Sequence, residues 1–170
     1  MDLRKTEPTD VERIMQIIDA AKISLRERGV NQWQGGTPNA EMIKTDIENG
    51  ESYVVVDNGK VTATCMVSFA GEPTYAKIID GKWLADGDYG VLHRVAVAED
   101  QKRKGMASFM FKQAMRLCKE NGIPSLRVDT HRDNIPMRTA LEHNGFTHCG
   151  TIFLANGAER VAYEKIIELK

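Results

Sequence analysis

One continuous stretch, Val91 to Leu117, joins an apolar run, a basic turn with a glycine, and a helix-forming segment. The apolar run is short and rich in β-branched residues, which is typical of a buried strand. Beyond the turn, apolar residues recur every three or four positions, as on one face of a helix: Met106, Phe109, Met110, Ala114, Met115 and Leu117. The stretch therefore predicts a strand, a tight turn and an amphipathic helix.

The turn itself, Lys102-Arg103-Lys104-Gly105, suits the binding of an anion. The first turn of a helix has backbone N–H groups without carbonyl partners and a partial positive charge. Gly105 lets a ligand approach the backbone, and three basic side chains surround it. A solvated basic turn before an ordinary helix is the alternative, since short motifs often arise by chance.

Composition bounds the kind of protein. The 170 residues suffice for one domain with a full core, and no repeat or linker divides residues 1–170. Lys and Arg number 23 against 24 Asp and Glu, so nothing in the charge balance predicts a nucleic-acid partner. We find neither a signal peptide nor an apolar run long enough to span a bilayer, and expect no membrane partner.

Three cysteines, Cys65, Cys118 and Cys149, are odd in number and widely spaced. No CxxC pair and no pair of histidines at i and i+4 accompanies them, so we expect no metal site. They are interpreted as reduced thiols of the core, which predicts a cytoplasmic location.

Further periodic segments complete the element order strand, helix, helix, strand, strand, strand, helix, strand, helix, strand, strand. Asn-Gly pairs at 58–59 and 156–157 mark two hairpin turns. The expected strands cover residues 1–5, 52–56, 61–69, 91–97, 125–130, 146–153 and 160–167. The expected helices cover 11–28, 40–49 and 134–143, with a long helix that starts at 106 and is ended by Asn121-Gly122-Ile123-Pro124.

The segment Gly71 to Gly90 is too long for a simple hairpin turn. It is either a solvated excursion with a small hairpin, or a pocket wall that attracts a cationic substrate through charge and cation–π contact. Its acidic and aromatic residues include Asp80, Asp86, Asp88, Tyr75, Trp83 and Tyr89. Trp33, in the loop 31–39, has two interpretations as well: it caps the edge of the core, or it lines an acceptor pocket.

Two motifs resemble the GCN5-related N-acetyltransferase (GNAT) superfamily, and the similarity extends over essentially the whole chain. Lys102–Ala107, KRKGMA, is similar to the family's acetyl-CoA pyrophosphate loop, Gln/Arg-x-x-Gly-x-Gly/Ala. Asn134, followed by Leu141–Phe146, resembles the family's Asn-led helix that ends in Gly-Phe. The resemblance implies an α+β, three-layer fold: a mixed, mostly antiparallel sheet, splayed between its fourth and fifth strands and flanked by helices.

The resemblance also implies the ligand and its contacts. Acetyl-CoA would be the cosubstrate, with no metal. The backbone near Val95 and Val97 would pair with the pantetheine arm and the acetyl oxygen, and Asn134 would bond the pantetheine or its surroundings. The pyrophosphate would be held by the loop residues Lys102, Arg103, Lys104, Gly105, Met106 and Ala107.

Two departures from the family pattern stand out. Lys102 occupies the first loop position in place of Gln or Arg, and keeps a charge suited to pyrophosphate. Leu141 stands where many members have a Tyr that protonates the departing thiolate. The thiolate then leaves unprotonated, takes a proton from solvent, or takes one from another group such as Tyr163 or Tyr89.

His93 is the candidate base for the amine's proton. It lies two residues before Val95, which in a regular strand puts both side chains on one face. An ordinary histidine pKa near 6.5 suits proton transfer at neutral pH. The alternative is a structural or water-positioning histidine. Glu72 and Asp88 are weaker candidates.

These residues together predict direct acetyl transfer to a primary amine, either a small cationic amine or the amino terminus of a peptide or protein. A CoA-binding sensor or interaction module on the same fold is the alternative, because Leu141 replaces the usual acid. The resemblance also makes a homodimer through the last strands an open expectation.

Overall fold

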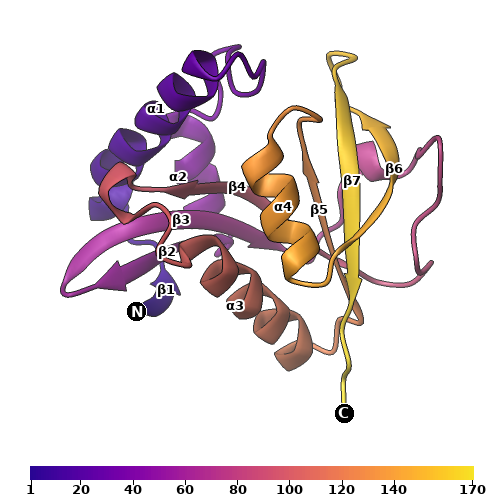
Figure 1. The fold of residues 1–170 in the computed structure, drawn as a ribbon. Helices are drawn as coiled ribbons and strands as arrows, with labels where there is room; N and C mark the ends of the chain where they lie inside the picture. The colour runs from indigo at the N-terminus through magenta and orange to yellow at the C-terminus, as the bar shows by residue number, and fades with distance from the viewer. The chain divides into compact units, whose positions relative to one another are not determined.

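The computed structural model describes residues 1–170, and its element order is the predicted one (Figure 1). The strands are β1 Asp2–Lys5, β2 Ser52–Asp57, β3 Lys60–Ser68, β4 Gly90–Val97, β5 Ser125–Thr130, β6 Thr147–Phe153 and β7 Glu159–Ile166. The helices are α1 Val11–Glu27, α2 Ala40–Glu48, α3 Met106–Glu120 and α4 Ile135–His143. Short 3-10 turns at Pro8–Asp10, Pro73–Tyr75 and Glu99–Gln101 are additions that periodicity does not predict.

Backbone pairing gives one mixed sheet with the strand order β1-β2-β3-β4-β5-β7-β6. The neighbours β1–β2, β2–β3, β5–β7 and β6–β7 pair antiparallel. Strands β4 and β5 are parallel and pair only at Gly90↔Leu126 and Val91↔Arg127, although β4 continues to Val97. The mixed sheet flanked by four helices confirms the predicted fold class, and the short β4–β5 ladder agrees with the expected splay.

The chain forms two compact units. The first contains residues 1–67 and 93–110, and the second contains residues 68–92 and 111–170. Strand β4 and helix α3 each begin in one unit and end in the other.

In the first unit, the apolar faces of α1 and α2 pack on the sheet. The buried cluster consists of Ile14, Ile17, Ile18, Ile43, Val54, Ala96 and Ala98. Its α1 members follow the i, i+3, i+4 spacing that defines a helical stripe. Asn39 caps α2 by accepting a hydrogen bond of 2.9 Å from the N–H of Met42. Trp33 packs against this cluster, which supports its interpretation as a residue at the core edge.

In the second unit, the excursion 71–90 is attached along β6. Ile79 and Thr151 exchange two backbone hydrogen bonds of 2.9 and 2.8 Å, which adds an isolated bridge to the outer side of that strand. The close approach requires glycine, since a Cβ at Gly81 would lie 1.9 Å from the carbonyl oxygen of Cys149. The excursion is therefore a fixed part of this unit.

Candidate active site

The predicted anion-binding turn has a backbone suited to that role. Both Arg103 (φ 64°) and Gly105 (φ 79°) adopt the left-handed conformation, so successive peptide groups change direction within the turn. Gly105 is exposed, and a Cβ placed there would meet no atom within 4 Å. The N–H of Phe109 donates to the carbonyl of Gly105 at 2.9 Å, so the helical bonding of α3 starts at this glycine. The turn thus opens directly onto a helix N-terminus.

The side chains around this turn fall into two groups. Arg103 and Lys104 are exposed, whereas the side chain of Met106 is buried and lies 3.9 Å from the hydroxyl of Thr62. Lys102 donates to Glu99 at 2.8 Å and to the hydroxyl of Ser24 at 3.3 Å. The charge of Lys102 is thus shared with a carboxylate and with α1.

The strand that precedes the turn departs from regular geometry at Arg94. This residue has φ 55°, a left-handed conformation that costs a residue with a side chain about 1–2 kcal/mol. A strand residue in this conformation disrupts the alternation of side chains. The prediction that His93 and Val95 share one face of the strand assumed strict alternation. The conformation of Arg94 removes the basis of that assumption. The assignment of His93 as the base stays a prediction.

Arg94 makes a close charged contact within this unit. Its Nε and Nη2 atoms donate to the two carboxylate oxygens of Asp46 at 2.8 and 2.7 Å. Only 17% of the Arg94 side chain and 7% of the Asp46 side chain is exposed. The residues Val95 and Val97, assigned to the pantetheine arm, are half-buried, as is His93.

Asn134 belongs to the second unit and is buried at the start of α4. Its side chain does not cap the helix, although asparagine is among the strongest capping residues. The predicted pantetheine contact remains an expectation for this side chain.

Leu141, where the family's Tyr was expected, lies completely buried in the core. Among the alternative acids, Tyr163 is also fully buried, and its hydroxyl accepts from Arg138 at 3.0 Å and donates to Glu142 at 3.3 Å. Burial raises the pKa of Tyr163. The hydroxyl of Tyr89 accepts from the N–H of Glu72 at 3.1 Å.

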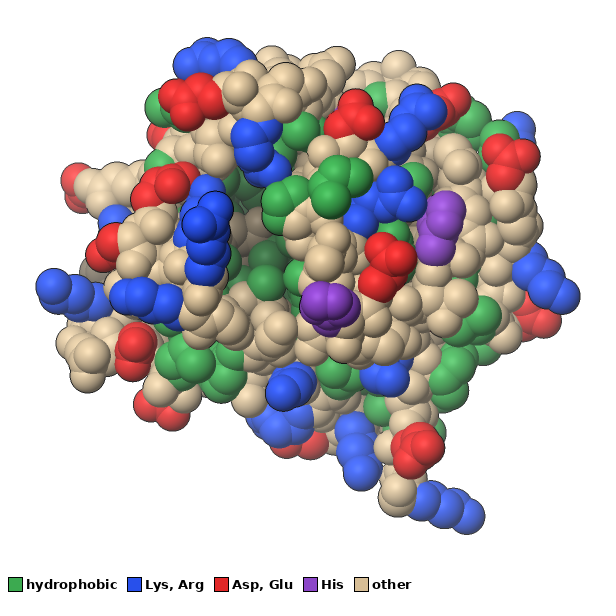
Figure 2. All heavy atoms as spheres, in the orientation of Figure 1, with side chains coloured by type: hydrophobic (Ala, Val, Ile, Leu, Met, Phe, Trp, Pro, Cys, Tyr) green, Lys and Arg blue, Asp and Glu red, His purple; other side chains and the backbone are tan.

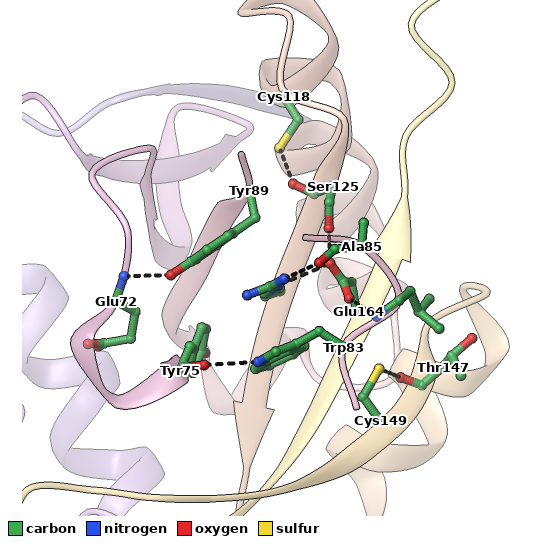
Figure 3. A network of polar contacts seen from close by, with 12 residues as sticks. Glu72, Tyr75, Trp83, Ala85, Tyr89, Cys118, Ser125, Thr147, Cys149 and Glu164 are labelled. Atoms are coloured by element: carbon green, nitrogen blue, oxygen red, sulfur yellow. Dashed lines mark hydrogen bonds and ion pairs between the residues drawn. The ribbon is translucent and has the colours of Figure 1, made fainter. Parts of the chain in front are cut away.

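Two aromatic side chains of the excursion, Trp83 and Tyr89, contact a cation of the protein itself. Both rings are labelled in Figure 3. The guanidinium carbon of Arg127 lies 4.1 Å from the ring centre of Trp83 and 4.0 Å from that of Tyr89. Cation–π contact was considered above for an external substrate, and these two rings make it with β5 instead. Tyr75 is buried beside them, and its hydroxyl donates to Asp129 at 2.6 Å. Burial is the main cause that raises the pKa of Tyr75.

A fully buried carboxylate, Glu164, completes this cluster (Figure 3). It lies directly opposite Arg127 across the β5–β7 ladder and accepts from its Nε at 3.0 Å. It also accepts from the hydroxyl of Ser125 and, at 2.6 Å, from the N–H of Leu84. Arg127 in turn donates to the carbonyl of Ala85 at 2.6 Å. The network therefore ties the excursion to β5 and β7.

Sequence reasoning missed Arg94, Asp46, Arg127 and Glu164. One signal was present for Asp46, which follows Ile43 by three positions and precedes Ile47, and so falls on the apolar stripe of its helix. An acid on such a stripe predicts a buried partner. No comparable signal marks Arg94, because its partner is 48 residues away in the sequence.

The surface and the titratable groups give three further observations. Lys and Arg side chains are interspersed with Asp and Glu on the face shown in Figure 2. No group of three or more His, Cys, Asp or Glu side chains is arranged to hold a metal ion. None of the helices combines the length and the apolar character that crossing a membrane requires.

The element order, the mixed sheet and the strand–turn–helix junction agree with the fold that the family resemblance implies. The chain belongs to the acetyltransferase (GNAT) family, whose model matches residues 16–146. It is therefore an acetyltransferase, and the family resemblance predicted from the two motifs is confirmed. Comparison with curated protein sequences finds no match.

Solved structures agree with this assignment. An acetyltransferase of the GNAT family from Streptococcus agalactiae 2603 is 33% identical, with a TM-score of 0.89 over 98% of this chain and 95% of that one. A GNAT acetyltransferase from Listeria monocytogenes 4b F2365 is 22% identical, with a TM-score of 0.74 over 97% and 94%. The Escherichia coli ribosomal-protein-S18-alanine N-acetyltransferase is 14% identical, with a TM-score of 0.68 over 99% and 95%. The last two similarities concern the fold alone.

Proposed function

We propose that this protein transfers the acetyl group of acetyl-CoA directly to a primary amine. The observation that carries the proposal is the turn at 102–105, in which two left-handed residues lead into the N-terminus of α3. An open backbone with nearby Arg103 and Lys104 suits a pyrophosphate. Membership of the acetyltransferase (GNAT) family supports acetyl-CoA as the donor.

Acetyl-CoA supplies the thioester. The backbone N–H groups from Arg103 to Ala107, with Lys102, would hold its pyrophosphate. The backbone at Val95 and Val97 would bind the pantetheine arm and the acetyl oxygen, and Asn134 would bond the pantetheine or its surroundings. In the transfer, a bond forms between the amine nitrogen and the acetyl carbon while the carbon–sulfur bond breaks. His93 accepts the proton of the amine, directly or through a water that it orients.

The sulfur of CoA needs a proton from a source other than Leu141. The hydroxyl proton of Tyr163 is directed to Glu142, so this phenol is a poor donor. We infer that solvent protonates the thiolate or that it leaves as the anion, with Tyr89 as the remaining side-chain candidate.

The acceptor is proposed to be a small cationic amine or the amino terminus of a peptide or protein. The Escherichia coli protein compared above is named for an alanine of ribosomal protein S18. Peptides with a free amino terminus should therefore be included among the acceptors that are screened. The rings of Trp83 and Tyr89 already contact Arg127, so a preference for cations would depend on exposed acids such as Asp86 and Asp88.

Calorimetric titration of acetyl-CoA tests the donor, and release of the CoA thiol tests turnover with a panel of small amines and short peptides. Binding together with acceptor-dependent thiol release is expected. Burial raises the pKa of Cys65 and Cys118 to about 12, so the protein's own thiols react little with the detecting reagent near neutral pH. Absence of binding at high micromolar acetyl-CoA would refute the proposal.

A CoA-binding sensor or interaction module is the second candidate, favoured by the burial of Leu141 in the core where the family acid was expected. Binding without thiol release across the panel would select it. We also propose a cytoplasmic location, supported by three free, buried cysteines. A homodimer remains a prediction, which light scattering after size exclusion would test.

A further inference from the structure

The inference concerns the irregular point of β4, where Arg94 is left-handed between His93 and Val95. A left-handed residue within a strand turns the adjoining peptide groups out of the regular ladder and redirects the neighbouring side chains. Such a conformation is unfavourable for a residue with a Cβ and persists where other contacts impose it. One contact that can impose it is that of the Arg94 side chain with Asp46.

That side chain is fixed at two points by α2. The fork of Nε and Nη2 meets both oxygens of Asp46 at 2.8 and 2.7 Å, a planar geometry that arginine provides and lysine does not. Asp46 lies on a helix whose Ile43 packs in the core of the same unit, so the carboxylate has a rigid support. Both partners are largely removed from solvent, which limits screening of the pair.

We propose that Asp46 is a positioning residue for the acetyl transfer: acting through Arg94, it holds the left-handed point of β4 that sets the backbone at 93–95 and the side chain of His93. The inference rests on the proposed function, which assigns His93 to the proton of the amine and Val95 to the bound thioester. Asp46 itself touches no reacting atom. Its loss should therefore impair turnover more than cosubstrate binding.

The test compares Asp46→Asn with Asp10→Asn. Asp10 forms a two-point pair with Arg4, at 2.8 and 3.1 Å, in the same unit. Arg4 belongs to β1, so this pair does not involve a residue of β4. Its side chain is 11% exposed, close to the 7% of Asp46. Each substitution weakens one two-point ion pair, and the partner arginine is 40% exposed for Asp10 and 17% exposed for Asp46. Measuring the free energy of unfolding of both variants beside kcat separates a loss of stability from a loss of positioning.

For Asp46→Asn we expect kcat to fall roughly 10- to 100-fold, as displacement of a reacting group by about 1 Å would cause, with KM for acetyl-CoA within about twofold of the wild type. Asp10→Asn should keep kcat within about twofold. Arg94→Lys should reproduce the Asp46→Asn defect, because lysine cannot form the two-point contact. Asp46→Glu should recover part of the lost kcat and also serves if Asp46→Asn does not fold.

A second readout does not depend on turnover. In backbone amide NMR spectra, Asp46→Asn and Arg94→Lys should shift the signals of His93 and Val95, and Asp10→Asn should leave them in place. An active wild type with unchanged kcat in Asp46→Asn would overturn the inference, as would unchanged signals at these two residues. A wild type that neither binds nor turns over acetyl-CoA would refute the proposed function, while the spectra would still decide whether Asp46 holds the backbone of β4.

Discussion

His93 and Gly105 contribute to different parts of the proposed reaction. His93 is half-buried beside the left-handed Arg94, and Gly105 is exposed in the turn before α3. The first would act on the proton of the acceptor and the second on the approach of the cosubstrate. Substitution at each position should therefore change a different kinetic constant.

Replacing His93 by Ala should lower kcat by about 10²-fold or more, the usual contribution of a positioned acid–base group. The measurement is acceptor-dependent thiol release at saturating acetyl-CoA, with the wild type assayed in parallel. Calorimetric affinity for acetyl-CoA should stay within a few-fold. An unchanged kcat would remove His93 from the mechanism and leave the fold assignment intact.

Replacing Gly105 by Ala should weaken acetyl-CoA binding, because the added Cβ strains a left-handed residue and fills space next to the turn. Gly59→Ala is a matched control: Gly59 has φ 76° against 79° for Gly105, and neither Cβ would meet an atom within 4 Å. Both variants should lose about 1–2 kcal/mol of unfolding free energy, the cost of a left-handed residue with a Cβ. Equal acetyl-CoA affinity in the two would contradict the role of the turn.

The pattern of residues predicted the turn at 102–105 and missed the ion pair of Arg94 with Asp46 on the strand before it. Residues Lys102–Ala107 are consecutive, so their anion-binding character can be predicted from the sequence without knowledge of the fold. The contact of Arg94 with Asp46 joins positions 48 residues apart and depends on one backbone angle, which no local pattern reports. Regular alternation was assumed for His93 and Val95, and the left-handed conformation of Arg94 between them leaves that assumption without support.

At the scale of elements, the excursion 71–90 is held by β5 and β7 through Arg127 and Glu164. Glu164 has no exposed surface and satisfies Arg127, Ser125 and the backbone of Leu84 together. A buried pair of this kind is sensitive to the loss of one partner, since the other charge stays buried without compensation. This pair is therefore one attachment of the excursion, beside the backbone bridge between Ile79 and Thr151.

Glu164→Gln should therefore reduce the free energy of unfolding by roughly 3 kcal/mol or more at neutral pH. Urea denaturation followed by circular dichroism measures the change. Glu159→Gln on the same strand is the control: the Glu159 side chain is 56% exposed, and its carboxylate pairs with Arg132 at 3.6 Å. This surface pair should contribute under about 1 kcal/mol. Similar losses in the two variants would show that the buried network contributes no more than a surface pair.

Element order was predictable from periodicity, and the attachment of the excursion was not. Apolar residues recur with a period of about 3.6 residues in the helices and 2 residues in the strands, because one face of each element must be buried. These periods locate the helices and strands. The excursion has no such repeat. It is ordered by residues remote in the sequence, as in the bridge between Ile79 and Thr151 and the contact of Arg127 with Trp83.

For the molecule as a whole, the three buried thiols make the free energy of unfolding depend on pH in the alkaline range. Burial raises the pKa of Cys65 and Cys118 to about 12 and that of Cys149 to about 11. In the unfolded chain a thiol titrates near 8.5. Above about pH 9 the unfolded chain thus releases protons that the native protein keeps, and the native state loses stability as the pH rises.

We expect the free energy of unfolding to decline from about pH 9 to about pH 11, with each thiol adding up to about 1.4 kcal/mol per pH unit to the slope. Urea unfolding at a series of pH values measures it. Cys65→Ala should make the decline shallower by about one thiol's share, whatever its effect on stability at pH 7. A decline of equal steepness in this variant would exclude the Cys65 thiol as a cause.

The attachment of the excursion also bears on how this enzyme could be engineered. Most surface loops can be exchanged between homologous scaffolds because their stability is local. Here the loop's aromatic rings enclose an arginine of one strand, and a carboxylate of another strand accepts from the loop backbone. A chimaera that receives residues 71–90 alone would lack Arg127, Ser125 and Glu164, so a functional transplant has to carry positions from three separate parts of the chain.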